Sequence, residues 1–296
     1  MPAARLVLAA DDIVGESIIW SPGEQALYWV DIVGGRIHRL DPATGEHRHW
    51  ETPELPTSIG LRRGGGFIVG LRQRVTLWRP DGPFETFAVP EPDKPENRLN
   101  EGVVAPDGSF WVGTMQDNIN PDRSPREMTA SAGALYRIAP DGGVARLTEP
   151  DFGITNTMVW TDDGRFVTAD TLKNTLYVYD YDDRANTLGN RRVFARLDRA
   201  LPDGSTRDKA GNVYNCRVVG GAAVARLGPD GGLLGYLELP CASPTSCTFG
   251  GPDLKTLYVT SSRFGLSEAE RRARPQEGAV FAIDTGWVGE PSHAFG

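Results

Sequence analysis

Short runs of alternating apolar and polar residues recur along the whole chain, and a turn rich in Pro, Asp or Gly precedes each unit. The runs are rich in aromatic and β-branched residues, which is typical of half-buried β-strands. Six runs follow such a turn, at residues 27–30, 67–69, 110–112, 166–168, 213–214 and 257–259. A second strand-like run comes after each, at residues 36–40, 75–78, 135–138, 176–179, 223–227 and 280–283. The pattern predicts an all-β protein.

The return of this unit after about 45 residues predicts the architecture. A six-bladed β-propeller with four antiparallel strands per blade accounts for the repeat, whereas a two-sheet sandwich does not. We expect residues 1–296 to form this single domain. Because the ring must close, residues 4–8 are expected to complete the last blade beside residues 280–283. Only residues 267–272 have the pattern of a short helix, with Ser267 as its cap.

Charge and composition narrow the range of partners. The chain has 31 Lys and Arg against 39 Asp and Glu, and its net charge of −8 argues against nucleic-acid binding. No apolar run approaches the roughly 18 residues that a membrane span needs. Three cysteines without a CxxC pair favour neither a disulfide framework nor a thiolate zinc site. We therefore expect a cytoplasmic protein without nucleic-acid or membrane partners, and the oligomeric state stays open.

Polar side chains occupy one phase of the repeat, seven or eight residues before the turn glycine. Four blades carry a carboxylate or carboxamide there, namely Glu16, Asn100, Asn156 and Asp203, and the other two offer Thr57 or Ser58 and Ser246. Equivalent positions in a closed ring converge on its axis. Asn and Asp also favour turns, but turn chemistry would not hold them at a constant distance from a separate turn. Several buried oxygens around one axis require a shared positive charge.

An all-oxygen donor set suits one divalent metal ion. Ca²⁺, Mg²⁺ and Mn²⁺ prefer such ligands, and Zn²⁺ with bound waters is an alternative. The four histidines, at positions 38, 47, 49 and 293, lie outside these segments. No Ser-His-Asp triad can therefore be assembled from the sequence.

Five segments in order along nearly the whole chain resemble the regucalcin-like sugar lactonases, the family of senescence marker protein, gluconolactonase and luciferin-regenerating enzyme. They are Gly-Glu-Ser at 15–17, Asn-Arg-Leu-Asn-Glu-Gly at 97–102 ahead of Trp-Val-Gly-Thr-Met at 111–115, Ile-Thr-Asn-Thr-Met-Val-Trp at 154–160, Pro-Asp-Gly-Ser-Thr at 202–206 and Thr-Ser-Cys-Thr-Phe-Gly-Gly at 245–251. The resemblance implies a six-bladed propeller with one catalytic divalent metal ion. Its ligands would be Glu16, Asn156 and Asp203.

The same resemblance implies which residues bind the substrate. Arg98 and Asn100 stand at family positions that contact it, and Glu101 stands where the family usually has Asp. Asn118 occupies the position of a substrate-binding Glu of the animal members. The sequence departs from the family pattern at two further positions, each directly after an implied metal ligand. Ser17 and Thr157 stand there, where the family commonly has glycine.

The function expected from these features is metal-dependent hydrolysis of a sugar-acid lactone, with water attacking the lactone carbonyl. Either Asp203 accepts the proton of that water, or metal-bound hydroxide attacks and Asp203 orients it. Residues 116–131 form a long polar segment without a strand pattern, either a lid or a surface excursion. Two alternatives to the lactonase are a calcium-dependent phosphotriesterase-like propeller hydrolase and a non-catalytic propeller that binds calcium or a protein partner.

Overall fold

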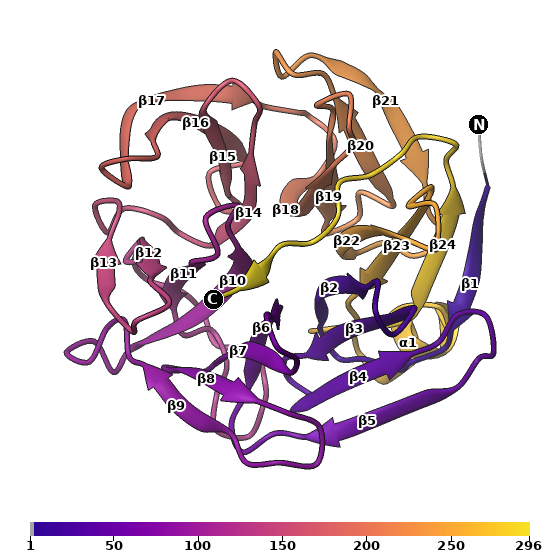
Figure 1. Cartoon of the computed structure of the whole chain (residues 1–296). Helices are drawn as coiled ribbons and strands as arrows, with labels where there is room; N and C mark the ends of the chain where they lie inside the picture. The colour runs from indigo at the N-terminus through magenta and orange to yellow at the C-terminus, as the bar shows by residue number, and fades with distance from the viewer. Residues whose placement is uncertain (1–2) are drawn as a thin grey trace.

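Six small antiparallel sheets form a ring around a central axis in the computed structural model, which describes residues 3–296 (Figure 1). In five of the six blades the four main strands are consecutive in sequence, and the first of them is innermost, as the repeat predicts. Blade 1 comprises β2 (Gly15–Ser21), β3 (Ala26–Asp31), β4 (Arg36–Leu40) and β5 (His47–Glu51). Blade 2 comprises β6 (Pro56–Arg62), β7 (Phe67–Leu71), β8 (Val75–Trp78) and β9 (Glu85–Ala88).

The next three blades repeat this plan. Blade 3 comprises β10 (Asn97–Val104), β11 (Phe110–Gln116), β12 (Leu135–Ile138) and β13 (Val144–Arg146). Blade 4 comprises β14 (Thr155–Trp160), β15 (Arg165–Asp170), β16 (Thr175–Asp182) and β17 (Thr187–Ala195). Blade 5 comprises β18 (Leu201–Arg207), β19 (Val213–Val218), β20 (Ala223–Leu227) and β21 (Leu233–Glu238). The predicted fold class is confirmed.

Both ends of the chain contribute to closing the ring. Blade 6 comprises β22 (Pro244–Gly250), β23 (Thr256–Ser261), β24 (Val280–Asp284) and the N-terminal strand β1 (Ala4–Leu8). Strand β1 pairs antiparallel with β24, in the place predicted for residues 4–8. The C-terminal segment crosses the ring (Figure 1), and its short strand β25 (Ala294–Phe295) pairs in parallel with β6. The ring is thus closed by hydrogen bonds between segments far apart in sequence.

Apolar side chains hold the blades together face to face. All six residues of β3 are buried, because both faces of that strand are covered. The rings of Tyr28 in blade 1 and Phe67 in blade 2 pack with their centres 4.5 Å apart. Each large side chain buried in this way contributes about 1.5–3 kcal/mol, so the contacts between blades stabilise the closed ring.

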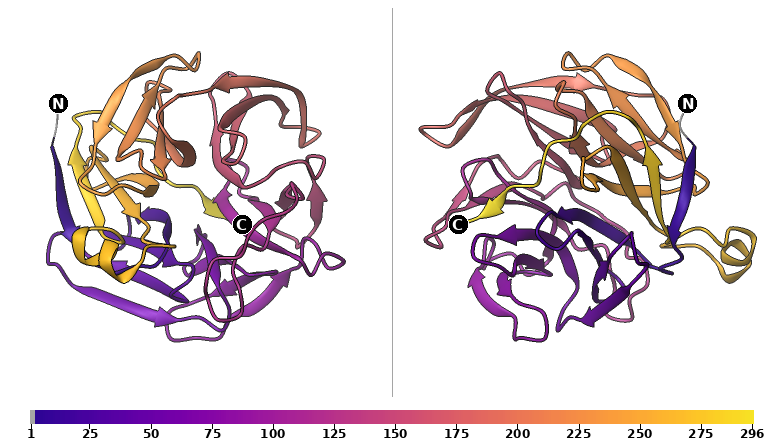
Figure 2. Two further views of the ribbon diagram at one scale, coloured as in Figure 1. Left: turned by 180° about the vertical axis from the view of Figure 1, so that it is seen from behind. Right: turned by 45° about the vertical axis from the view of Figure 1, so that its right-hand side comes forward.

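The one α-helix among residues 3–296, α1 (Glu268–Ala273), projects from blade 6 (Figure 2). It begins where the sequence predicts it, with Ser267 and Glu270 forming a capping box that satisfies the first free N–H groups. None of its residues is buried. No helix in the described part of the chain is long and apolar enough to cross a membrane.

Every innermost strand contains an irregularity at the same height. The pairing of each first strand with the second shifts register within residues 16–19, 56–58, 99–102, 156–158, 202–205 and 244–247. Such bulges re-aim side chains and are common next to active sites. Each of the six bulges contains the polar position that lies seven or eight residues before the turn glycine or its equivalent. The fold therefore places these polar side chains at one level of the channel.

Candidate functional site at one end of the central channel

The bulges of four blades place buried polar side chains close to one another at the start of the innermost strands. Glu16, Asn156 and Asp203 are exposed by only 9%, 4% and 6%, and Asn100 is also buried. The amide nitrogen of Asn100 donates to the side-chain oxygen of Asn156 at 3.3 Å and to the carbonyl of Thr155 at 2.8 Å. Strands β10 and β14 are therefore linked at the axis.

Three carboxylates from three blades influence one another at this level. Burial and the charge of Glu101 raise the pKa of Glu16 to about 8. Burial likewise raises the pKa of Glu101 to about 7. The pKa of Asp203 lies well above its ordinary value because of burial and the charges of Glu16 and Glu101. Buried like charges of this kind are stable only with a cation or bound protons.

The donor set at this level fits a divalent cation. Two carboxylates and an amide oxygen are ligands that hard divalent ions accept. Within residues 3–296 no three His, Cys, Asp or Glu side chains are grouped to hold an ion by themselves. An ion between Glu16 and Asp203 would therefore need the oxygen of Asn156 and water to complete its shell.

The amide of Asn156 is oriented by its neighbours. Its nitrogen donates to the hydroxyl of Thr171 at 2.8 Å, and that hydroxyl donates to the carbonyl of Pro202 at 2.8 Å. The side-chain oxygen therefore faces Asn100 and the axis. Partners of this kind orient metal ligands in many proteins.

Arg98 is the buried cation beside these groups. It donates to the side-chain oxygen of Asn100 at 2.8 Å, and two of its nitrogens donate to that of Asn118 at 2.9 and 3.2 Å. Burial lowers the pKa of Arg98 to about 10, and Asp117 and Glu16 oppose that shift. The guanidinium is thus charged at neutral pH, and it links the bulge of β10 to the segment after β11.

Asp117 and Arg72 complete this arrangement, although the sequence analysis missed both. The Asp117 carboxylate lies 3.8 Å from Arg98 and accepts a hydrogen bond from Nε of Arg72 at 2.7 Å. From there the segment between β11 and β12 reaches blade 1, where Arg123 donates to the carbonyl of Gly34. The only available signal was the position of Asp117 next to Asn118. The long segment is thus anchored to two other blades on the side of the site.

Ser17 and Thr157 follow Glu16 and Asn156 and have left-handed backbones, with φ of 51° and 57°. Non-glycine residues, and β-branched ones above all, rarely adopt such angles. The hydroxyl of Ser17 accepts from the amide of Ile59 at 3.0 Å, and that of Thr157 donates to the carbonyl of Asp203 at 2.5 Å. Each hydroxyl ties its bulge to the next blade. The glycine replacements noted in the sequence therefore stand where the backbone is strained.

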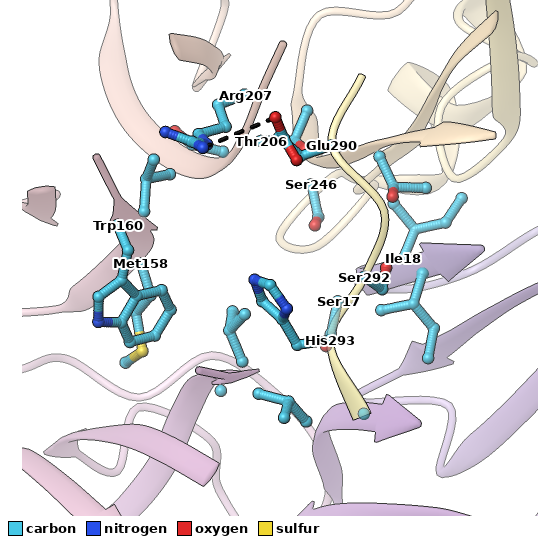
Figure 3. A pocket seen from close by; sticks show the side chains of 18 of the residues that line it. Ser17, Ile18, Met158, Trp160, Thr206, Arg207, Ser246, Glu290, Ser292 and His293 are labelled. Atoms are coloured by element: carbon cyan, nitrogen blue, oxygen red, sulfur yellow. Dashed lines mark ion pairs between the residues drawn. The ribbon is translucent and has the colours of Figure 1, made fainter. Parts of the chain in front are cut away.

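A cavity of about 440 Å³ occupies the other part of the channel, where the innermost strands end (Figure 3). Its polar lining includes Ser17 and Glu101, and its apolar lining includes Ile18 and Met158. Residues 290–293 of the C-terminal segment border it, and His293 points into it (Figure 3). His293 thus lies closer to the channel than the sequence indicated. Glu101 faces this cavity, whereas Arg98 and Asn118 do not line it.

The fold and this site define a class, the six-bladed propellers with a polar site in the central channel. Residues 14–263 match the model of the SMP-30/gluconolactonase/LRE-like region, and the chain belongs to this family.

Named relatives match along almost the whole length. The 6-deoxy-6-sulfogluconolactonase of Pseudomonas putida is 37% identical over 94% of this chain and 93% of its own. Pentonolactonase XacC of Haloferax volcanii is 33% identical over 94% of this chain and 93% of its own. Regucalcin of Gallus gallus is 32% identical over 95% of this chain and 94% of its own. Among solved structures, a calcium-binding regucalcin from Agrobacterium tumefaciens superposes with a TM-score of 0.91 at 27% identity, covering 100% of this chain and 98% of that one.

Proposed function

We propose that this protein hydrolyses a sugar-acid lactone to the open-chain sugar acid. The observation that carries the proposal is the convergence of Glu16, Asn156 and Asp203 from three blades, beside the buried cation Arg98. Two relatives are named as lactonases of sugar acids, and they cover more than nine tenths of the chain. The substrate class is therefore an aldonolactone, a small polar molecule with several hydroxyl groups.

One divalent ion, Ca²⁺, Mg²⁺, Mn²⁺ or Zn²⁺, is the proposed cofactor, with Glu16, Asn156 and Asp203 as its protein ligands. The raised pKa values of Glu16 and Asp203 support this, because they reflect carboxylates that lack a compensating charge. When bound, such an ion polarises an ester carbonyl and acidifies water. The regucalcin from Agrobacterium tumefaciens is a calcium-binding protein, which supports a divalent ion without identifying it.

The chain's own residues bind and orient the substrate in this proposal. Arg98 carries only donors, so it suits the hydroxyl groups of the sugar and the carboxylate that forms. Asn118 and Asn100 offer both donors and acceptors, and Glu101 is a further acceptor on the channel side. Binding a ring that is already oriented towards the reacting groups lowers the entropic cost of the attack.

Asp203 is the proposed base. It takes a proton from the attacking water while the water oxygen bonds to the lactone carbonyl carbon. The bond from that carbon to the ring oxygen then breaks, and the ring oxygen leaves as a hydroxyl after gaining a proton. A general base held in this position typically contributes about 10²–10⁴-fold to the rate.

A panel of aldonolactones, assayed by proton release with a pH indicator, tests the function. The panel should include five- and six-membered rings and 6-deoxy-6-sulfogluconolactone, each with EDTA and with metal add-back. We expect at least one aldonolactone to be opened, EDTA to abolish turnover and a divalent ion to restore it. Turnover of an organophosphate alone, or of nothing in the panel, would contradict the proposal. The cytoplasmic location and the single-domain organisation stay predictions.

A further inference from the structure

A fully buried arginine lies behind Asp203, and no Asp or Glu among residues 3–296 forms an ion pair with it. Arg217, on β19, is 0% exposed. It donates to the carbonyls of Arg199 at 2.9 Å and Ala200 at 2.5 Å, and to the side-chain oxygens of Asn215 at 2.8 Å and Asn174 at 3.0 Å. All these acceptors are neutral. An arginine is rarely buried so completely unless it is paired, so this one requires a reason.

One of these acceptors connects Arg217 to the candidate site. The nitrogen of the Asn215 side chain donates to the main-chain carbonyl of Asp203 at 2.9 Å and to the hydroxyl of Ser205 at 3.0 Å. Because Arg217 donates to the oxygen of the same amide, the amide cannot turn over. Its nitrogen is therefore held towards Asp203.

The carbonyl of Asp203 needs such a partner because it lies in a bulge. The pairing of β18 with β19 shifts register within residues 202–205, so this carbonyl is outside the regular ladder. The hydroxyl of Thr157 is its second donor, at 2.5 Å. Gly204 follows, and a side chain there would meet the carbonyl of Thr245 at 2.9 Å. The flexible glycine alone cannot fix the direction of the Asp203 side chain.

We propose that Asn215, oriented by Arg217, is a positioning residue that holds the Asp203 main chain so that its carboxylate faces the channel. This inference rests on the proposed role of Asp203 as base and metal ligand. The guanidinium also brings a positive charge to the back of a site that holds three carboxylates. Outer-shell partners of this kind typically change activity or metal affinity by about 10–100-fold when they are replaced.

Asn215→Asp is the test, and Asn174→Asp is its matched control. Each substitution replaces an amide with a carboxylate beside Arg217, and each removes one donated bond to a carbonyl. The lost bond goes to Asp203 in the first case and to Leu197 in the second. We expect similar melting temperatures, a kcat about 10–100-fold lower in Asn215→Asp with KM changed much less, and a kcat within about twofold of the parent in Asn174→Asp. Thr157→Val removes the other donor without adding charge and should lower kcat in the same direction.

Two readouts separate this proposal from the function on which it rests. Mn²⁺ affinity, measured by calorimetry without substrate, should weaken in Asn215→Asp relative to Asn174→Asp. Crystal structures of both variants should show the Asp203 main chain displaced only in Asn215→Asp. If the parent protein opens no lactone, the proposed function is wrong. The Mn²⁺ affinity and the position of the Asp203 main chain still test the positioning role of Asn215. An Asp203 that stays in place in Asn215→Asp, or an equal loss of kcat in both variants, would overturn the positioning role.

Discussion

The two ends of the central channel are built from the same six strands but differ in chemistry. Where the innermost strands begin, bulges turn buried carboxylates and amides towards the axis, and Arg98 supplies a buried positive charge. Where the same strands end, a cavity of about 440 Å³ has walls of mixed polarity, and the C-terminal segment borders it (Figure 3). At the rim of this cavity, Arg207 and Glu290 form an ion pair at 3.6 Å.

This difference teaches that open volume and chemistry are separate properties of a propeller channel. The cavity is roomy, yet two oppositely charged groups at its rim, Arg207 and Glu290, are paired with each other. At the start of the strands the polar side chains are buried, yet the carboxylates repel one another and lack sufficient positive charge. Unbalanced buried charge is therefore the better guide to the reactive end.

The largest expected effect comes from the carboxylates at the start of the strands. Asp203→Asn should lower kcat/KM for the best lactone by about 10²–10⁴-fold, because a base in this position typically contributes that much. The measurement is the initial rate of proton release at saturating metal. Glu290→Gln at the other end is the control and should stay within about twofold. Comparable losses in both variants would remove the distinction between the two ends.

Arg98→Lys should have the next largest effect. Lysine keeps the charge but loses the planar fork that reaches Asn100 and Asn118 together. We expect kcat/KM to fall by about 10-fold or more, chiefly through KM, since the fork is proposed to bind the substrate. Steady-state kinetics with several lactones measures the split. An unchanged KM would argue against substrate contact by Arg98.

The metal-free protein should lose stability as the pH rises. Glu16 and Glu101 have ordinary pKa values of 4.5, which burial raises to about 8 and about 7. Between pH about 6.5 and about 8 the folded state holds protons on these carboxyl groups that the unfolded chain has released, so the free energy of unfolding falls with rising pH. Below this range the buried His38, whose pKa burial lowers to about 3, contributes in the opposite direction. Urea unfolding in EDTA at several pH values measures this slope.

Two controls sharpen that prediction. A saturating divalent ion should flatten the slope, because it compensates the ionised carboxylates, and Glu16→Gln should reduce it without any metal. A free energy of unfolding that stays constant or rises over this range in EDTA would show that these carboxylates are not strained by burial.

The smallest effect is expected from His293, at the other end of the channel. His293→Leu should change kcat and KM by less than about twofold, because this side chain lines the cavity rather than the start of the strands. The aldonolactone assay checks this directly. A loss of tenfold or more would mean that substrate reaches the site through the cavity.

The repeat pattern was sufficient to predict the six blades, the closing strand β1 and the level at which Glu16, Asn100, Asn156 and Asp203 lie. Periodicity carries this information because every blade repeats the same turn and strand. The bulges themselves were not predictable, because Ser17 and Thr157 are not residues that favour left-handed angles.

The supporting residues were equally hidden in the sequence. Asn215 and Arg217 alternate within the ordinary strand pattern of β19, and only the fold reveals that both are buried behind Asp203. Arg72 lies in another blade from Arg98, so its link through Asp117 depends on tertiary contacts. Contacts between distant segments leave no local pattern in a single sequence.

Anomalous diffraction from a crystal soaked in Mn²⁺ tests the central claim most directly. The account predicts one strong peak at the start of the innermost strands, within bonding distance of oxygens of Glu16, Asn156 and Asp203. A peak only in the cavity beside Ser17 and Glu101, or no peak at a concentration that supports turnover, would contradict it.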